Sequence, residues 1–356
     1  MGTGFATTSD PCLLGILGAR ALRIVFMGSP QEVISPLQQL LAAGDDSQGG
    51  QGSGEFEVVA VVSQPARPVG RSGKLQDPPV AEFAKGLGLK VMQPESARDP
   101  GFLDELRALR PDVIVTAAYG QILSKKFLAI PRRGTINIHP SILPKYRGAT
   151  PVPAALLNGD MVTGVTVLFT VKELDAGAII CVEEAPVLPG ETSGELTSRM
   201  FGVGGRLLIE ALGKLRDPSF AGTPQDDAAA TYCGKIDKAD GAVDWTRGAR
   251  LTCNRFRAFH PWPGTFTFLH GKRVMLLEIR EASAVDLGSG GAPAGEPGSF
   301  TFSKLAKGIL VRGADGILLI TKLQNEGGKP VDAAAFWNGI KDRTACRFSA
   351  GDRGGA

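Results

Sequence analysis

The sequence lacks the features that mark disulfide-stapled, zinc-bound or membrane-spanning chains. Its five cysteines are odd in number and scattered, and no two of them form a C-x-x-C pair. We therefore expect neither a disulfide framework nor a zinc cluster, and we expect a reducing compartment. No apolar run approaches the ~18 residues that a membrane-spanning helix requires. Hydrophobic residues make up 43% of the chain and charged residues 21%, the balance of a globular protein with a sizeable core.

The sequence also lacks the usual nucleotide-binding fingerprints. Gly28 follows the first apolar run, but a G-x-G-x-x-G motif needs further glycines where Pro30 and Val33 stand. There is no P-loop either. A sheet built on this sequence is therefore not expected to bind NAD or ATP. The net charge of +3 is weak support for a nucleic-acid partner, because a basic surface can be local without dominating the total.

The length of 356 residues suits two domains better than one. Over residues 22–215, short apolar runs alternate with amphipathic stretches, which predicts an α/β domain with an open, Rossmann-like parallel sheet and helices on both faces. A capping box from Thr192 to Glu195 predicts a helix that runs to about Leu215. The strands are expected at residues 22–27, 56–62, 89–92, 113–116, 135–139, 162–170 and 178–187.

The rest of the chain has a different pattern. Residues 216–240 contain prolines and acidic or small residues and are interpreted as an interdomain linker. Residues 241–345 hold one helix followed by short β-rich pieces, which predicts a small, OB-like β-barrel. Residues 1–21 are acid-poor and form either a partial organelle transit segment or a flexible leader. The glycine-rich residues 44–54 are expected to form a flexible surface insertion.

Residues 137–144 carry the densest chemistry. They begin at the carboxyl end of an expected strand, where open α/β sheets place their ligands. Alternation along the strand sends Asn137 and His139 to the same side. An imidazole exchanges protons near neutral pH, and an amide N–H stabilises an oxyanion, so the pair suits acyl transfer to an amine. Taken alone, however, a histidine at a strand end is more often a structural hydrogen-bonding residue.

The residues of this region resemble the folate-dependent formyltransferase family. The matching residues are Asn137, His139, the run Ser141-Ile142-Leu143-Pro144, Tyr146-Arg147-Gly148 and the later Leu174-Asp175-Ala176-Gly177. The resemblance implies that Asn137, His139 and Asp175 are the catalytic residues, and that no metal takes part. It also implies a folate site lined by Ser141, Ile142, Leu143, Pro144, Tyr119 and Gly120. The spacing of His139 and Asp175 does not by itself bring them together.

Three features resemble the branch of the family that formylates methionyl-tRNA: residues 63–71, residues 257–263, and a likeness that runs from about Leu22 to about Gln324. This branch implies 10-formyltetrahydrofolate as the formyl donor and the amino group of initiator methionyl-tRNA as the acceptor. It also implies a monomer that does not bind membranes. Likeness to plant members implies an organelle, mitochondrion or chloroplast, or the cytoplasm if the source is bacterial. The alternatives are another folate-dependent formyltransferase, a formyltetrahydrofolate hydrolase, or a tRNA-binding module without catalysis.

Arg67, Arg71 and Lys74 lie in a segment with glycine and proline on both sides. One interpretation is a solvated surface loop, since loops often carry basic residues without a role. The other is a wedge that contacts phosphate or base at the acceptor end of the tRNA. The sequence leaves both open.

Overall fold

The computed structural model describes residues 20–44, 54–70, 73–341, 343 and 346–350. The expected leader and glycine-rich insertion lie outside these residues apart from their edges, and so does Arg71. The chain divides into two compact units, Met1–Thr135 and Ile136–Ala356, which are described separately. Within the described ranges, no helix is long and apolar enough to cross a membrane.

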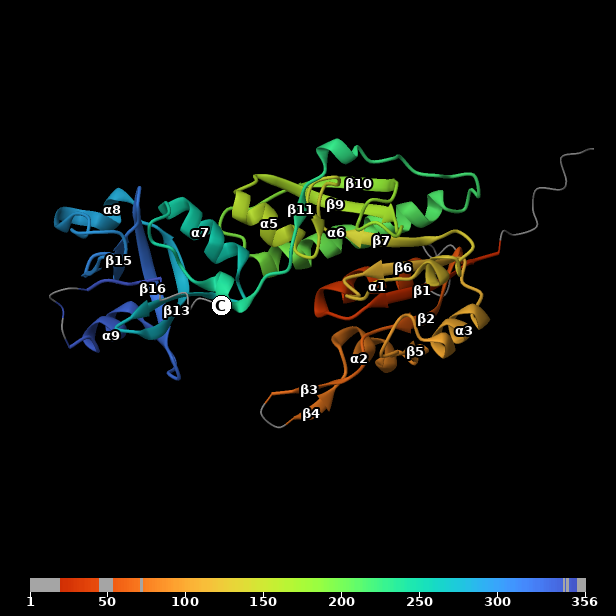
Figure 1. Ribbon diagram of the computed structural model, residues 1–356, viewed down its shortest axis with the longest axis horizontal. Helices are drawn as coiled ribbons and strands as arrows, with labels where there is room; N and C mark the ends of the chain where they lie inside the picture. Colours follow the sequence, from red (N-terminus) through yellow and green to blue (C-terminus); the bar gives the residue numbers. More distant parts are fainter. Residues whose placement is uncertain (1–19, 45–53, 71–72, 342, 344–345, 351–356) are drawn as a thin grey trace, which may run out of the picture. The chain divides into compact units, whose positions relative to one another are not determined.

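The first unit is built on four parallel strands in the order β6-β1-β2-β5 (Figure 1). The four residues 24–27 of β1 are fully buried, which explains why this strand is a continuous apolar run rather than an alternating one. The expected parallel arrangement is confirmed here. The strands are β1 (Leu22–Gly28), β2 (Phe56–Val62), β5 (Val91–Met92) and β6 (Val113–Ala117). The helices are η2 (Gln31–Val33), α1 (Ile34–Gly44), α2 (Pro79–Gly86), α3 (Pro100–Ala108) and α4 (Lys125–Leu128).

A small hairpin extends from the first unit where the sequence indicated only a loop. It consists of β3 (Arg67–Val69) and β4 (Lys74–Gln76), which pair in antiparallel fashion. All six of these residues are exposed, so the hairpin is held by its backbone ladder rather than by a core. The two basic residues Arg67 and Lys74 therefore lie on the two strands of one exposed ribbon.

The second unit begins with strands in the order β10-β9-β7. They are β7 (Thr135–His139), β9 (Val162–Phe169) and β10 (Ile179–Pro186), and both pairings are antiparallel. The strand positions agree with the expected ones, but their direction does not agree with a purely parallel sheet. Only nine residues join β9 to β10, and a parallel return needs a crossover of about a dozen residues or more.

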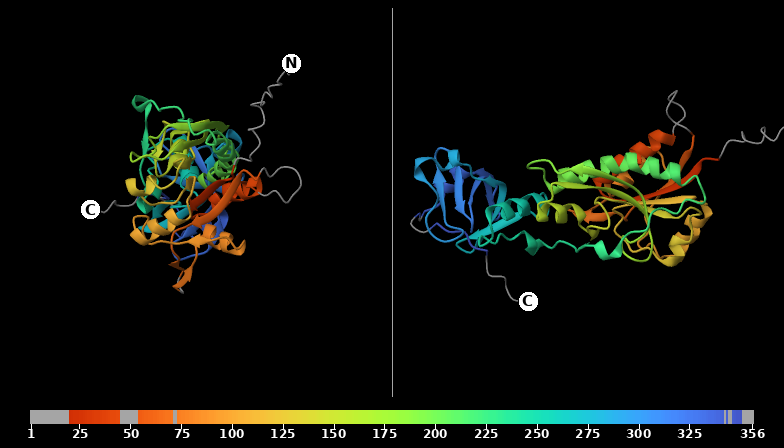
Figure 2. Two further views of the ribbon diagram at one scale, coloured as in Figure 1. Left: turned by 90° about the vertical axis from the view of Figure 1, so that its right-hand side faces the viewer. Right: turned by 90° about the horizontal axis from the view of Figure 1, so that it is seen from above.

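Helix α6 (Ser193–Lys214) packs on β9 and β10, and it comes close to β7 at Gly204 (Figures 1 and 2). The expected capping box is confirmed, with reciprocal Thr192 and Glu195 hydrogen bonds at its start. At Gly204 the helix comes so close to the strand that a Cβ would lie 2.6 Å from Ile138 Cγ2. A larger residue at Gly204 would displace β7, whose other face carries Asn137 and His139.

Short elements connect these strands to the C-terminal part. Strand β8 (Arg147–Gly148) pairs in parallel with β11 (Tyr232–Cys233). Helices α5 (Pro151–Asn158) and α7 (Ala249–Ala258) pack on each other. The remaining helical pieces are η4 (Asp227–Ala229), η5 (Lys238–Gly241), α8 (Ala284–Leu287), η6 (Gly288–Gly290) and α9 (Ala333–Asn338).

The C-terminal strands, blue in Figure 2, form an antiparallel sheet. Their order is β12-β13-β16-β15-β14, with β17 beside β16. The residues after the last helix bridge the two edges, because Ser349 pairs with Phe268 of β12 and Arg347 pairs with Ser299 beside β14. Phe348 between them is 1% exposed and stacks on Phe300. This segment closes the expected barrel. The strands are β12 (Thr265–Leu269), β13 (Lys272–Glu281), β14 (Phe300–Ser303), β15 (Gly308–Arg312), β16 (Ile317–Asn325) and β17 (Pro330–Asp332).

Candidate active site

His139 is the last residue of β7 and lies almost wholly inside the protein. It pairs with Thr166 of β9, and its side chain is 5% exposed. Asn137 is partly buried two residues earlier and pairs with Leu168. Strand alternation therefore places both side chains on one face of β7, as the sequence predicted.

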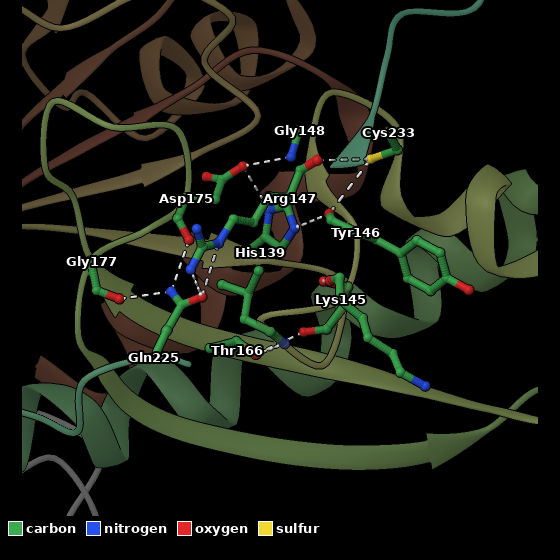
Figure 3. Close-up of polar contacts among 12 residues, drawn as sticks. His139, Lys145, Tyr146, Arg147, Gly148, Thr166, Asp175, Gly177, Gln225 and Cys233 are labelled. Atoms are coloured by element: carbon green, nitrogen blue, oxygen red, sulfur yellow. Dashed lines mark hydrogen bonds and ion pairs between the residues drawn. The ribbon is translucent and has the colours of Figure 1, made fainter. Parts of the chain in front are cut away.

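The two ring nitrogens of His139 have different partners (Figure 3). Nε2 lies 2.9 Å from the carbonyl oxygen of Tyr146. Because a carbonyl can only accept, Nε2 carries the hydrogen of that bond. Nδ1 lies 3.7 Å from Oδ2 of Asp175. In the neutral ring Nδ1 is therefore the basic nitrogen, and it faces a carboxylate.

Burial decides the protonation of this imidazole. Removal from water lowers the pKa of His139 below its ordinary value, and this effect outweighs the opposing influence of the Asp175 charge and the Tyr146 carbonyl. The neutral ring is thus favoured near pH 7. A buried neutral imidazole with a free nitrogen beside a carboxylate can take a proton and have the resulting charge stabilised.

Asp175 is held in an unusual backbone conformation. Its φ is +49°, in the left-handed region that aspartate tolerates better than most residues. The backbone N–H of Gly148 donates to Asp175 Oδ2 over 2.9 Å. Gly148 itself has a φ of +124°, and a Cβ there would overlap the carbonyl oxygen of Cys233. Only glycine can therefore bring this N–H to the carboxylate without moving β8 away from β11.

A second set of contacts supports the same region, and sequence reasoning missed it. The Arg147 side chain is 2% exposed, and it donates through Nη2 to Asp227 Oδ1 over 2.7 Å and to Gln225 Oε1 over 2.8 Å. Gln225 in turn donates through Nε2 to the carbonyls of Asp175 and Gly177, each over 2.8 Å (Figure 3). Gln225 belongs to the segment interpreted as a linker, which has no periodicity or motif to mark it.

The residues expected to bind folate are found in two places. Ile142, Leu143 and Pro144 line a cavity of about 490 Å³. Ser141 is fully buried, and its hydroxyl donates to the carbonyl of Lys145 over 2.7 Å, so it shapes the loop, and its part in a folate site stays a prediction. The loop is tied to β9 because Thr166 Oγ1 accepts from Leu143 N and donates to the Ser141 carbonyl.

Tyr119 and Gly120 belong to the first unit. Tyr119 packs in its hydrophobic core, and burial raises the pKa of its phenol to about 12. Its carbonyl accepts from Gln64 Nε2 over 2.8 Å. Gly120 has a φ of +83° and follows directly. The part of Tyr119 and Gly120 in a folate site stays a prediction. Because the Tyr119 ring is buried in the core, we expect their backbone groups to make the contact with folate.

Of the residues expected to meet tRNA, Arg67 and Lys74 are described and exposed. Arg67 Nη2 lies 2.7 Å from Glu95 Oε2, with the two side chains 62% and 73% exposed. Such an exposed pair is weak and leaves the guanidinium available to another anion. Arg71 lies outside the described residues. The wedge therefore stays a prediction.

Together these features define an acyl-transfer type of site on an α/β scaffold. A buried imidazole lies 3.7 Å from a carboxylate at the end of β7, and an amide side chain lies on the same face of that strand, which suits attack of an amine on a carbonyl carbon. In the ranges that the structure describes, no group of three or more His, Cys, Asp or Glu side chains is placed to hold a metal ion.

Comparison with known proteins gives the family. Residues 22–212 match the family model described as formyl transferase, and residues 235–341 match the formyl transferase C-terminal domain. The methionyl-tRNA formyltransferase of Moorella thermoacetica is 38% identical over 318 residues, covering 89% of this chain and 96% of that protein. The enzyme of the same name from Roseiflexus castenholzii is 39% identical over 321 residues, with 90% and 97% covered. The chain belongs to the formyl transferase family, and within it to the group of the methionyl-tRNA formyltransferases.

Solved structures agree at the level of the fold. HypX from Aquifex aeolicus, in complex with tetrahydrofolic acid, has a TM-score of 0.58 at 17% identity over 89% of this chain. The chain spans about half of HypX, 47% of its length. WlaRD, a sugar 3N-formyl transferase, has a TM-score of 0.58 at 16% identity, with 85% of this chain and 98% of that chain covered. The two curated relatives named above are bacterial, so the organellar location expected from the sequence gains no support.

Proposed function

We propose that this protein transfers the formyl group of 10-formyltetrahydrofolate to the amino group of initiator methionyl-tRNA. The product, N-formylmethionyl-tRNA, would serve translation initiation. The observation that carries the proposal is the pairing of His139 with Asp175 at the end of β7, in a chain about 38% identical to methionyl-tRNA formyltransferases over most of its length.

The first step requires a neutral attacking amine. An α-amino group titrates at about 7.7–8.0, so a substantial fraction is unprotonated at neutral pH. Its nitrogen forms a bond to the formyl carbon while negative charge develops on the formyl oxygen. The Asn137 amide would donate to that oxygen, an interaction worth about 3 kcal/mol in comparable sites.

The second step moves one proton. As the bond between the formyl carbon and N10 of the folate breaks, N10 must gain a proton and the amine must lose one. His139 Nδ1 is the acceptor that the geometry offers, because Nε2 is already bonded to the Tyr146 carbonyl. Asp175 would stabilise the imidazolium until the proton reaches N10. The bonding of Nε2 to the Tyr146 carbonyl therefore favours the role of base for His139.

The two parts of the chain would divide the work. Residues 22–215 would hold the folate and the chemistry, with the cavity beside Ile142, Leu143 and Pro144 taking part of the donor. Residues 241–345 and the basic hairpin with Arg67, Arg71 and Lys74 would bind the tRNA. We also propose that the protein acts as a monomer.

The test is a formylation assay with the purified full chain and 10-formyltetrahydrofolate. Charged initiator tRNA, charged elongator methionyl-tRNA, an amino sugar nucleotide and buffer alone serve as acceptors. Formyl transfer to the initiator methionyl-tRNA with little formate release in buffer is the expected result. Formate release that is independent of any acceptor would indicate a hydrolase, and preference for the amino sugar would indicate another transferase. Tight tRNA binding without formyl transfer would favour the alternative of a tRNA-binding module without catalysis.

A further inference from the structure

Gln225 occupies a central place beside the candidate catalytic residues. Its amide oxygen accepts from Arg147 Nε over 3.1 Å and from Nη2 over 2.8 Å. Its amide nitrogen donates to two carbonyls of one turn, those of Asp175 and Gly177, each over 2.8 Å. The side chain is partly buried, so water competes only weakly for these bonds.

The turn that Gln225 contacts is one that needs support. Asp175 has a φ of +49°, which a non-glycine residue keeps only where the surroundings hold it. Gly177 lies so close to the end of β9 that a Cβ would overlap the carbonyl oxygen of Phe169. The turn is thus pressed against the sheet on one side and bonded to Gln225 by two of its carbonyls.

Strand β8 reaches Asp175 by two routes. Gly148 N–H donates directly to the Asp175 carboxylate, and the neighbouring Arg147 reaches the Asp175 backbone through Gln225. Both the backbone and the carboxylate of Asp175 are therefore held by contacts that lead to β8. Fixing both ends sets the direction in which Oδ2 points, and so its 3.7 Å separation from His139 Nδ1.

We propose that Gln225 is a positioning residue for the reaction, which acts by holding the turn that carries Asp175. The inference rests on the proposed formyl transfer for its readout, but not for its geometry. Gln225 touches no reacting atom in this account. Its removal should therefore lower kcat through the placement of Asp175 and leave substrate affinity nearly unchanged.

Two substitutions at Gln225 test the donor and the acceptor of its amide group. Gln225→Met keeps the length of the side chain and removes every hydrogen bond. Gln225→Glu keeps an oxygen acceptor for Arg147 but sets a second oxygen against the two carbonyls. Both should lower kcat ~10- to 100-fold with KM for folate and for methionyl-tRNA changed less than ~3-fold, because misplacement of about 1 Å can cost that much.

The chain offers a matched control in Gln324. This glutamine is also partly buried, and its Nε2 also donates to a turn carbonyl, that of Gly328, over 2.8 Å. Gln324→Met removes the same kind of bond in a part of the chain that holds no proposed catalytic residue, and it should leave kcat within ~2-fold of the unmodified chain. Because residues 241–345 are proposed to bind the tRNA, this control is compared by kcat and not by KM for methionyl-tRNA. Thermal unfolding of all variants shows whether any loss of activity reflects unfolding instead.

The decisive comparison is a double-mutant cycle with Asp175→Asn. If Gln225 acts through Asp175, Gln225→Met should lower kcat less than ~2-fold further in the Asp175→Asn background, since coupled residues are not additive. Full additivity, or an unchanged kcat for the folded Gln225→Met and Gln225→Glu proteins, would overturn the inference. Absence of formyl transfer by the unmodified chain would refute the proposed function instead. In that case hydrogen exchange at residues 174–177 tests whether Gln225 holds this turn. Equal protection of these amides in the unmodified chain and in Gln225→Met would overturn the inference.

Discussion

The Asp175 carboxylate lies 3.7 Å from Nδ1 of His139, while the Gly148 N–H holds the same carboxylate oxygen at 2.9 Å. The opposite nitrogen of the ring is bonded to the Tyr146 carbonyl. The imidazole is thus fixed at Nε2 and left basic at Nδ1. Among the described residues, Asp175 is the only anion within ion-pair distance of the ring, and it lies where it would stabilise a positive charge on the imidazole during the reaction.

Replacing Asp175 by asparagine should separate catalysis from folding. The amide keeps the shape of the side chain but cannot stabilise an imidazolium, so kcat should fall ~10²- to 10⁴-fold with a much smaller change in KM. Steady-state kinetics with methionyl-tRNA and thermal unfolding of the same preparation provide the measurement. A folded Asp175→Asn protein with near-normal kcat would refute the role given to this carboxylate.

The stability of the protein should depend on pH through His139. Because burial lowers the pKa of this residue, the unfolded chain binds a proton that the folded chain does not, between the folded pKa and about 6.5. Stability from this residue is fully present above about pH 6.5 and is lost as the pH falls through that window, by at most about 1.4 kcal/mol per pH unit. Urea unfolding of the unmodified chain and of His139→Gln at pH 7.5, 6.5 and 5.5 tests this. Equal pH slopes for the two proteins would contradict it.

Gly148→Ala should damage both the fold and the site. The added Cβ would overlap the Cys233 carbonyl, and the alanine would have to adopt a φ of +124°. We expect a loss of about 2–4 kcal/mol in the free energy of unfolding and a lower kcat, because the N–H that binds Asp175 moves with the strand.

The control for this substitution is Gly190→Ala. Gly190 also has a positive φ, +77°, but a Cβ added there would meet no atom within 4 Å. The change should cost only the backbone strain, about 1–2 kcal/mol, and leave kcat unchanged. Equal losses of stability and activity in the two variants would show that the contact with Cys233 does not matter.

The hairpin provides a test of tRNA binding. Arg67→Ala should change the free energy of unfolding by less than about 0.5 kcal/mol, since its pair with Glu95 is exposed. If the hairpin meets tRNA, kcat/KM for methionyl-tRNA should fall ~5- to 30-fold, with less effect at high salt.

Glu95→Gln is the matched control for Arg67→Ala. It breaks the same ion pair but leaves the guanidinium free, so kcat/KM for methionyl-tRNA should stay the same or rise. Parallel losses in Arg67→Ala and Glu95→Gln would mean that the ion pair itself is what matters. No effect of Arg67→Ala on kcat/KM would favour the solvated-surface interpretation for this residue.

Much of the scaffold followed from local rules that the sequence displays. The buried run of β1, the strand that ends at His139 and the capping box of α6 each depend on residues close together in the chain. The alternation that puts Asn137 and His139 on one face of β7 is likewise a property of any strand. The predicted parallel sheet is confirmed for β6, β1, β2 and β5, but β9 pairs in antiparallel fashion with both of its neighbours. Strand direction depends on the connection and the pairing partner, which apolar patterning does not encode.

The sequence by itself determined the positions of the seven strands expected in residues 22–187, the long helix, the candidate catalytic residue types and the resemblance to formyltransferases. Only the tertiary structure brought Asp175 within 3.7 Å of His139, because 35 residues, including strands β8 and β9, lie between them in the chain. It also turned part of the expected linker into the support of that pair. Gln225 and Arg147 are 78 residues apart in the chain, and their side chains are hydrogen-bonded over 2.8 Å. Such contacts join residues that are far apart in the sequence, and neither periodicity nor local motifs predict them.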